Sequence, residues 1–180
     1  IELTYRYQGA LVGVAIADLV SGLFAAQGIL LALYARERSG RGQHVDVAML
    51  DSVAALLTYQ AAIYFATGAP PARLGNAHPT VAPYETFQAS DGDVVLAAGN
   101  DDLWRKFCGV AGLQAIANDP RFAKNRDRVR NYGELRPIVA AAFRSRTRAD
   151  WIAGLDAAGV PAGSVRDLHE VLNDPQLLAR

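Results

Sequence analysis

The sequence predicts an α/β protein built in two parts, and three observations lead to this prediction. Residues 1–67 contain two long, largely apolar stretches of helical character. Residues 68–83 contain four of the eight prolines, which is typical of a linker or an ordered loop. Alternating apolar and polar residues then flank Asp91-Gly92, a strong signal for a β-hairpin. We therefore expect a mainly helical part over 1–67, a linker over 68–83 and a small α/β part over 84–180.

The first expected element is an apolar run over residues 11–17 that ends at Asp18. A helix follows from Leu19 to about Arg38. It is apolar on nearly every face, which is typical of a buried helix. The glycine just beyond its last turn, Gly40, is expected to end it.

The next expected element is a short strand over residues 44–49, because its residues alternate and include two valines. A second helix follows, capped by Asp51 or Ser52 and running to about Thr67. Two apolar helices in so short a segment need a large surface to pack against. We expect a missing part of the protein or a partner subunit to provide that surface.

The second part is expected to open with the hairpin, formed by residues 84–89 and 93–98. Asn100 or Asp101 is then placed to cap a helix, since Asn and Asp are favoured at that position. This helix carries apolar residues at helical spacing.

Three more helices are expected in the second part, over about 133–145, 148–158 and 166–172. Thr147 and Asp150 stand three residues apart before the middle one and resemble a capping box. No repeat of 20–50 residues is present in the sequence.

The composition is that of a globular chain. Of the 180 residues, 51% are hydrophobic and 20% are charged, and 18 basic residues balance 18 acidic ones. Disordered chains combine low hydrophobicity with high net charge, and nucleic-acid-binding proteins usually carry a basic excess. Neither class is therefore expected. The single cysteine, Cys108, excludes an intramolecular disulfide and a Cys-rich metal site, and indicates a buried thiol in a cytoplasmic protein.

The ends of the chain and its apolar segments lead to two further expectations. No apolar run reaches the roughly 18–20 residues of a membrane-spanning helix, so no membrane association is expected. The chain starts at Ile1 without an initiator methionine or a signal-peptide pattern, and it stops at Arg180 soon after an Asp-Pro turn. We expect it to be a piece of a longer protein.

Several common catalytic motifs are absent from the sequence. It contains neither a phosphate-binding GxxxxGK[ST] loop nor a GxSxG nucleophile elbow. The three histidines, His44, His78 and His169, are not spaced as zinc ligands. Kinase, serine hydrolase and zinc enzyme functions are therefore not expected, and no metal site is predicted.

Asp18 is the first candidate catalytic residue. It lies between an apolar run and an apolar helix, and its side chain is expected at the helix N-terminus. The unpaired N–H groups and the helix dipole stabilise an anion there. An ionised carboxylate in this position can act as a nucleophile or a base. The alternative is a plain N-cap, because Asp is a favoured capping residue.

The second candidate region is the loop that contains Gly75, Asn76 and His78. The glycine allows close approach of the backbone to a ligand, and the two polar side chains offer hydrogen-bond donors. The alternative is an ordered loop between domains whose polar side chains bond to its own backbone. His44, His169 and Cys108 are expected to have structural or surface roles.

Six motifs taken together resemble those of a known family. In chain order they are GVAIADLVSG (13–22), SGRGQHVDVAMLD (39–51), RLGNAHPTVAPYETF (73–87), SDGDVVLAAGND (90–101), DPRF (119–122) and AGVPAGSVRDLHEVLNDPQ (158–176). Their order is similar to that in family III CoA-transferases, which include formyl-CoA:oxalate and succinyl-CoA:dicarboxylate enzymes. The 2-methylacyl-CoA racemases are relatives. The resemblance covers the chain from about residue 11.

The resemblance implies a fold and an assembly. Members have a large Rossmann-like α/β domain, a smaller α/β domain and long connecting segments, and two subunits thread through each other as an interlocked homodimer. In these terms residues 1–67 would belong to the large domain, and residues 84–180 would form the small one.

The resemblance also implies roles for the candidate residues. Asp18 would be the nucleophile that attacks an acyl-CoA thioester, with coenzyme A as a substrate and no permanently bound cofactor. Met49 would lie near the bound coenzyme A, although a buried strand residue is the alternative. Gly75, Asn76 and His78 would approach the acyl group of the substrate. The form of this loop is most similar to succinyl-CoA-dependent transferases.

Two alternative functions remain open at this stage. A 2-methylacyl-CoA racemase would use the matching aspartate for proton transfer instead of nucleophilic attack. In a second alternative, this chain is a folding or dimerisation module that is inactive when isolated. Acyl-CoA and a carboxylic acid are the expected partners, and neither a nucleic acid nor a membrane is expected.

Overall fold

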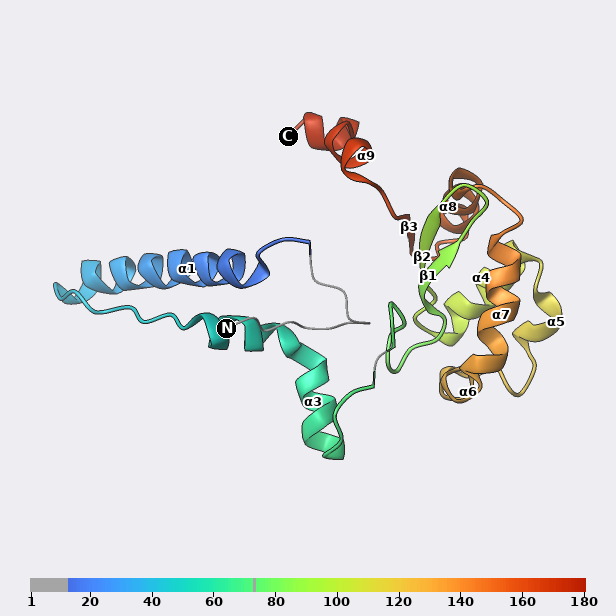
Figure 1. Cartoon of the computed structure of the whole chain (residues 1–180), viewed down its shortest axis with the longest axis horizontal. Coiled ribbons are helices and arrows are strands. Elements are labelled where there is room, and N and C mark those ends of the chain that lie inside the picture. The colour runs from blue at the N-terminus through green and yellow to red at the C-terminus, as the bar shows by residue number, and fades with distance from the viewer. Residues whose placement is uncertain (1–12, 73) are drawn as a thin grey trace. The chain divides into compact units, whose positions relative to one another are not determined.

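The structure is a computed structural model of the 180-residue chain, and it describes residues 13–72 and 74–180. The chain divides into two compact units, Ile1–Gly75 and Asn76–Arg180 (Figure 1). We call them unit 1 and unit 2. The division falls inside the stretch 68–83 that the proline content marks as a linker. The assignment of unit 1 to a large domain and of unit 2 to a small domain stays a prediction.

Unit 1 is helical in the part that the structure describes. Its elements are α1 (Ile16–Ser39), α2 (Met49–Ala54), the short 3-10 helix η1 (Ala55–Leu57) and α3 (Thr58–Thr67). Helix α1 begins three residues earlier than the sequence predicts. It ends as expected at Gly40, whose φ of 70° gives the left-handed conformation that glycine adopts most easily. The predicted apolar run over 11–17 lies partly outside the described residues.

The predicted strand over residues 44–49 is wrong. Residues 41–48 instead return along α1 without regular secondary structure, and Met49 already belongs to α2. The return passes close to Gly28, where a Cβ atom would lie only 2.8 Å from Val45 Cγ1. A strand needs a hydrogen-bonded neighbour, and the described residues of unit 1 contain no strand that could pair with this segment.

The second predicted helix is present, but it starts earlier and is interrupted. Its N-cap is Ala48, so neither Asp51 nor Ser52 has the capping role that the sequence suggests. Ser52 Oγ instead donates back to the carbonyl of Ala48 at 2.9 Å, within the first turns. At Thr58 the backbone φ is 41°, an unfavourable value for a β-branched residue, and this break separates α3 from the helical turns before it.

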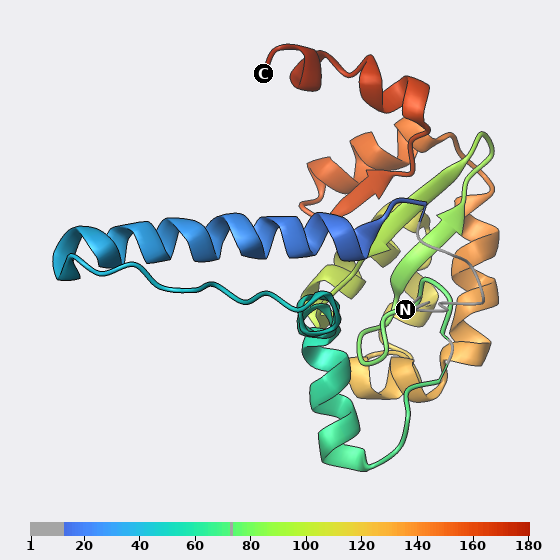
Figure 2. The same cartoon turned by 60° about the vertical axis from the view of Figure 1, so that its left-hand side comes forward.

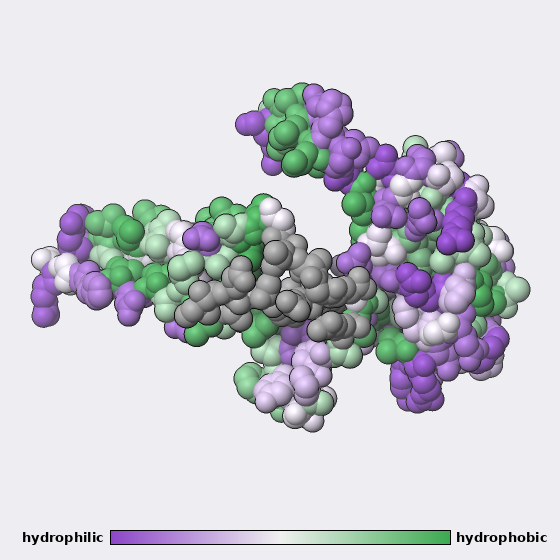
Figure 3. Space-filling view, in the orientation of Figure 1, coloured by the Kyte–Doolittle hydropathy of each residue, from purple (hydrophilic) through white to green (hydrophobic). Residues whose placement is uncertain are grey.

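The apolar surface of unit 1 is exposed within this chain. Helix α1 contains no buried residue, and Figure 3 shows hydrophobic side chains along its length. Helix α1 and the segment Met49–Thr67 are both long and apolar enough to cross a membrane, which contradicts the prediction that no segment of this length exists. The prediction failed because it required an unbroken apolar run, whereas a spanning helix tolerates a few polar residues. A core helix of a soluble protein meets the same two criteria.

Unit 2 contains a three-stranded antiparallel sheet in the order β1-β2-β3. The strands are β1 (Tyr84–Gln88), β2 (Asp93–Ala97) and β3 (Ala162–Ser164). The predicted hairpin is confirmed, with Phe87 paired to Val94 across the turn at Gly92. Strand β3 was not predicted, because its three residues are too short for an alternating pattern.

Seven helices of unit 2 accompany the sheet in the part of the chain described. They are α4 (Asp101–Ala111), α5 (Gln114–Ala117), α6 (Asn125–Arg130), α7 (Tyr132–Phe143), α8 (Arg148–Ala157), α9 (Leu168–Leu172) and α10 (Pro175–Leu178). Asn100 caps α4, with its Oδ1 accepting from the Leu103 N–H at 2.9 Å. The predicted capping box of Thr147 and Asp150 is present at the start of α8.

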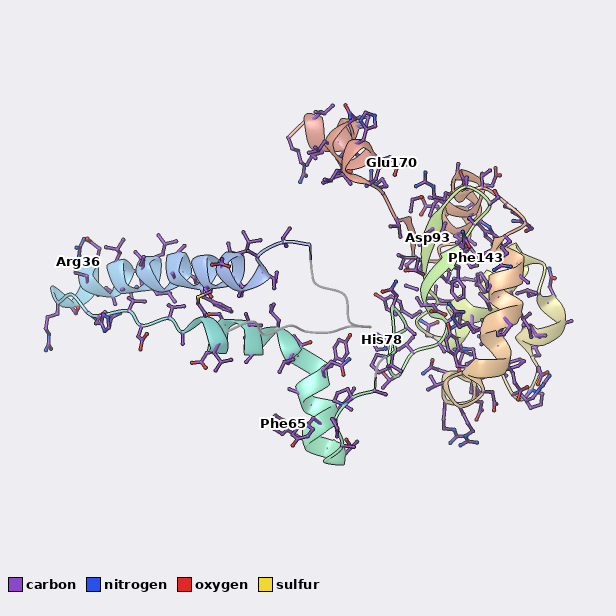
Figure 4. The ribbon with its side chains drawn as sticks, viewed as in Figure 1. Arg36, Phe65, His78, Asp93, Phe143 and Glu170 are labelled. Carbon is purple, nitrogen blue, oxygen red and sulfur yellow. The ribbon has the colours of Figure 1, made fainter. Side chains whose placement is uncertain are left out.

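The core of unit 2 is centred on Phe143, in α7 (Figure 4). Its ring lies 4.5 Å from Trp151, 5.0 Å from Phe87 and 5.9 Å from Phe107, measured between ring centroids. One strand and three helices therefore meet at a single aromatic side chain. Cys108 is buried in the same core as predicted, and this burial raises the pKa of its thiol to about 12.

We expect Phe143→Ala to destabilise unit 2 by about 3–5 kcal/mol, because it removes the ring on which the other aromatic side chains pack. Urea unfolding followed by tryptophan fluorescence would measure the loss, since both tryptophans lie in this core. Leu168→Ala is the matched control, because this leucine side chain is 77% exposed, and it should change stability by less than about 0.5 kcal/mol. Equal effects of the two substitutions would contradict the assignment of the core.

Candidate functional site

Asp18 lies in the first turn of α1, as its third residue, and it is exposed. The N-cap is Ala15, so the alternative interpretation of Asp18 as a plain N-cap is wrong. The carboxylate is still near the N-terminal end of a 24-residue helix, where the dipole and the N–H groups of the first turn favour a negative charge. This position combines a carboxylate near a helix N-terminus with access from solvent.

Met49 is the first residue of α2 and is 49% exposed. The alternative interpretation of a buried strand residue is therefore wrong on both points. Helix α2 contacts α1 and lies beside the N-terminal half of that helix, as Figures 1 and 2 both show. The helices that carry Asp18 and Met49 are thus neighbours within unit 1.

The second candidate region, the loop that contains Gly75, Asn76 and His78, spans the division between the units. Gly75 is buried at the end of unit 1, with a φ of 64°. Asn76 and His78 begin unit 2, which places them in a different unit from Asp18. Asn76 Nδ2 donates to Thr86 Oγ1 at 3.4 Å, so the loop contacts strand β1.

His78 is fixed against the start of β1 (Figure 4). Its ring stacks on Tyr84 with a centroid separation of 5.3 Å and an interplanar angle of 12°. Its backbone N–H donates to the Tyr84 carbonyl at 2.9 Å. Its ring Nδ1 accepts from the Thr80 backbone N–H at 3.2 Å. The imidazole is thus held by contacts with both Tyr84 and Thr80.

Arg128, in α6, is the functional candidate that the sequence did not reveal. Its side chain is completely buried, and its donors reach main-chain oxygens of Ala82 (2.6 Å), Phe122 (3.0 Å) and Ala123 (3.2 Å). Nη2 donates to Asp101 Oδ1 at 3.0 Å. In the sequence Arg126, Arg128 and Arg130 alternate, and no local signal separates the buried arginine from its neighbours.

Burial changes the pKa of the two charged residues of this cluster in opposite directions. Burial lowers the pKa of Arg128, and the hydrogen bond and charge of Asp101 oppose that effect. Partial burial raises the pKa of Asp101, but hydrogen bonds from Arg128 and Asn125 outweigh it and leave the pKa below its ordinary value. The cluster is therefore an ion pair at neutral pH.

A second buried carboxylate, Glu85, lies on strand β1. Tyr132 Oη donates to Glu85 Oε1 at 2.6 Å, and Arg136 Nε donates to the same oxygen at 2.7 Å. Burial and the neighbouring carboxylate raise the pKa of the tyrosine hydroxyl well above its usual range. Both donors come from α7, so this group connects the strand to that helix.

No cluster of three or more His, Cys, Asp or Glu side chains that could bind a metal ion occurs in residues 13–72 and 74–180. The histidines His44 and His169 are exposed in separate units.

Residues 5–180 match the model of CoA-transferase family III. The acetyl-CoA:oxalate CoA-transferase of Acetobacter aceti is 43% identical over 93% of this chain and 43% of its own length. The succinate–glutarate CoA-transferase of Agrobacterium fabrum is 41% identical over 93% of this chain and 42% of its own length. This chain therefore spans less than half the length of these relatives.

Two solved structures are similar to this chain. A CaiB/BaiF family protein from Brucella suis is 41% identical, with a TM-score of 0.77 over 94% of this chain and 45% of the other. A hypothetical protein from Mycobacterium tuberculosis is 29% identical, with a TM-score of 0.81 over 94% of this chain and 45% of the other.

The Arg128–Asp101 pair predicts acid sensitivity of unit 2. The pKa of Asp101 is lower in the folded state than in the unfolded state, so its stabilising effect is present at neutral pH and is lost as pH falls through the folded value. Urea unfolding at pH 7, 4 and 3 should show this loss. Asp101→Asn should reduce the slope of stability against pH by at most about 1.4 kcal/mol per pH unit, the value for one proton. The exposed Asp156→Asn is the control, and an unchanged slope in Asp101→Asn would contradict the assignment.

Proposed function

The chain belongs to CoA-transferase family III, and we propose from this that the complete protein transfers coenzyme A from an acyl-CoA donor to a carboxylic acid. One observation carries the proposal. Asp18 is exposed in the first turn of a long helix and has no capping role there. The names of the two relatives, which include oxalate in one and succinate and glutarate in the other, support a dicarboxylic acid as acceptor, and we propose succinyl-CoA as the donor.

In the proposed reaction an oxygen of the Asp18 carboxylate attacks the thioester carbonyl of the donor. The C–S bond breaks, coenzyme A leaves as the thiolate, and an aspartyl–acyl anhydride forms. The thiolate then attacks the aspartyl carbonyl, which releases the donor acid and leaves an aspartyl thioester of coenzyme A. The helix N-terminus suits these steps because it favours the ionised nucleophile and offers N–H donors to a developing oxyanion.

The second half of the reaction runs the same steps toward the acceptor. The acceptor carboxylate attacks the aspartyl thioester, the thiolate leaves, and a second anhydride forms. The thiolate attacks the acceptor carbonyl of this anhydride, which forms the new acyl-CoA and regenerates the Asp18 carboxylate. Every covalent step takes place at one side chain, and coenzyme A enters and leaves as a substrate.

For the remaining candidate residues we propose the roles that the family resemblance implies. Met49, next to α1, would contact the bound coenzyme A. Gly75, Asn76 and His78 would approach the acyl group and the acceptor acid. Hydrogen bonds to charged groups are among the stronger ones, which suits recognition of an acid.

The assembly that we propose places unit 1 in a large Rossmann-like domain and unit 2 in a small α/β domain of an interlocked homodimer. The exposed apolar surface of α1 supports this proposal, because a helix with no buried residue in 24 needs a covering surface. The rest of the large domain and the partner subunit would provide it. We also propose that the enzyme is cytoplasmic and has neither membrane nor nucleic-acid partners.

We expect Asp18→Asn to abolish transfer in the full-length protein, with kcat reduced by about 10³-fold or more, because the nucleophile is lost. Full-length protein incubated with succinyl-CoA and then reduced with borohydride should show the mass change of a carboxyl-to-alcohol reduction in the Asp18 peptide. The variant should show none. Asp51→Asn is the matched control, since Asp51 is an exposed aspartate in the first turn of α2.

A second assay distinguishes the racemase alternative from the proposed transferase. A racemase would exchange the α-hydrogen of a 2-methylacyl-CoA with solvent deuterium and would form no reducible adduct. Exchange without an adduct at Asp18 would overturn the transferase proposal.

We expect the isolated 180-residue chain to bind coenzyme A at least about 100-fold more weakly than the full-length protein. The chain spans under half of its relatives, and the upstream part is expected to supply most of the contacts to coenzyme A. Isothermal titration calorimetry on both proteins would measure the difference, with tryptophan fluorescence used to verify that unit 2 is folded. Equal affinities would place the coenzyme site within this chain.

A further inference from the structure

Residues 41–48 connect the end of α1 to α2, and we call them the return segment. Figures 1 and 2 both show this segment beside α1, running from the end of the helix back toward its N-terminal half. The segment contains no regular secondary structure. Its position therefore depends on its contacts with the helix, and both elements belong to unit 1.

The burial of alternate side chains shows how the return segment lies on α1. Val45 and Val47 are partly buried, whereas His44, Asp46 and Ala48 are exposed. Residues two positions apart point to the same side of an extended chain. Val45 lies against the helix, so Val47 faces it as well. The alternation in the sequence, which predicts a strand, here packs the segment on a helix.

The helix offers small residues to this contact. Ala25, Gly28 and Ala32 are partly buried and share one face of α1 at helical spacing. The approach is closest at Gly28, where a Cβ atom would lie only 2.8 Å from Val45 Cγ1. Carbon atoms in contact are normally about 3.5–4.0 Å apart. Valine cannot easily turn its side chain away, because branching at Cβ restricts χ1. Glycine at position 28 therefore determines how close the return segment comes to the helix.

The spacing along the two elements relates this contact to the candidate site. Asp18 precedes Gly28 by ten residues, which correspond to about 15 Å along a helix axis. Met49 follows Val45 by four residues, and an extended chain covers about 13 Å in four residues. Both distances run toward the N-terminal end of α1, because the segment runs back along the helix. Contact of Val45 with Gly28 therefore brings Met49 to the level of Asp18.

We propose that Gly28 is a positioning residue: by leaving room for Val45 on α1, it places Met49 at the level of Asp18, where Met49 contacts the bound coenzyme A. This inference rests on the proposed function, which assigns that contact to Met49. Gly28 acts only through the return segment. An added methyl group would displace the segment by about 1 Å, the difference from a normal carbon–carbon contact, and would move Met49 with it.

The test uses Gly28→Ala, Val45→Ala and the double variant in the full-length protein. In the double variant the new methyl group at position 28 occupies space that the valine methyl groups leave. Gly42→Ala is the matched control, because it is the same substitution within the return segment and its Cβ would meet no atom of this chain within 4 Å. Met49→Ala provides the reference for loss of the proposed contact.

We expect Gly28→Ala to raise Kd for coenzyme A by about 10-fold in isothermal titration calorimetry, because a displacement of about 1 Å is enough to weaken a positioned contact. Val45→Ala should raise Kd by about five-fold, since it leaves a gap, and the double variant should return to within about two-fold of the wild type. Gly42→Ala should also stay within about two-fold.

Two readouts distinguish positioning from a general loss of structure. A substitution that only reduces the folded fraction lowers the binding stoichiometry and the apparent kcat, and it leaves Kd and KM unchanged. In the Met49→Ala background, Gly28→Ala should raise Kd by less than about two-fold, because the contact that it positions is already lost.

The outcomes separate this inference from the proposed function. A wild-type protein that binds coenzyme A but transfers none would refute the proposed function, whereas the Kd values of the variants would still test the positioning. A folded Gly28→Ala variant with the wild-type Kd would overturn the positioning role. An undiminished effect of Gly28→Ala in the Met49→Ala background would overturn it as well. If Gly28→Ala alone fails to fold, by circular dichroism, the double variant decides, since its Kd must then lie below that of Val45→Ala.

Discussion

The buried guanidinium of Arg128 is the interaction on which the arrangement of unit 2 around residues 76–83 depends. Its donors reach Asp101 at the start of α4, the turn at residues 122–123 and Ala82 just before β1. Three segments far apart in the sequence therefore converge on one side chain. Because an unpaired buried cation is strongly destabilising, removing any one of these acceptors weakens the position of the others. Asn125 extends the same cluster to Thr80, and through it to the imidazole of His78.

The elements that could be predicted from the sequence are those governed by local rules. Asp91-Gly92 indicates the hairpin, and Asn100 indicates the start of α4. The pair Thr147 and Asp150 indicates the start of α8. Each of these signals depends only on residues within a few positions of one another. Arg128 could not be found in this way. Its guanidinium is buried because it donates to acceptors that lie between five and forty-six residues away in the sequence. Its neighbours Arg126 and Arg130 are also arginines, so residue type does not single it out. Hydrogen bonds from a polar side chain to residues far away in the sequence leave no periodic pattern in the sequence.

Unit 1 was predicted less well, and the reason is also physical. A helix that is apolar on nearly all faces has no amphipathic pattern to mark its register, so the predicted start of α1 is three residues too late, and an N-cap role of Asp18 stays open as an alternative in the sequence. The alternation over residues 44–49 indicated a strand, but a strand is stable only beside another one. Asp18 and the loop with Gly75, Asn76 and His78 are candidates by residue type and position, whereas Met49 and the assigned roles come from the resemblance of six motifs to a family. The family model confirms that membership. The geometry of the candidate residues in unit 2 came only from the structure.

The two units differ in how completely this chain determines them. Unit 2 has a closed aromatic core around Phe143, and it contains the contacts of His78 with Thr80 and Tyr84. Unit 1 exposes most of its apolar side chains, so the surroundings of Asp18 depend on surfaces outside this chain. Under the proposed function, the nucleophile Asp18 and the loop residues Asn76 and His78 therefore lie in different units. Substitutions in the packing of unit 2 would then change which acid is recognised while the covalent chemistry at Asp18 stays the same. Such a separation would suit a family whose members bear the names of different acids, oxalate in one and glutarate in another.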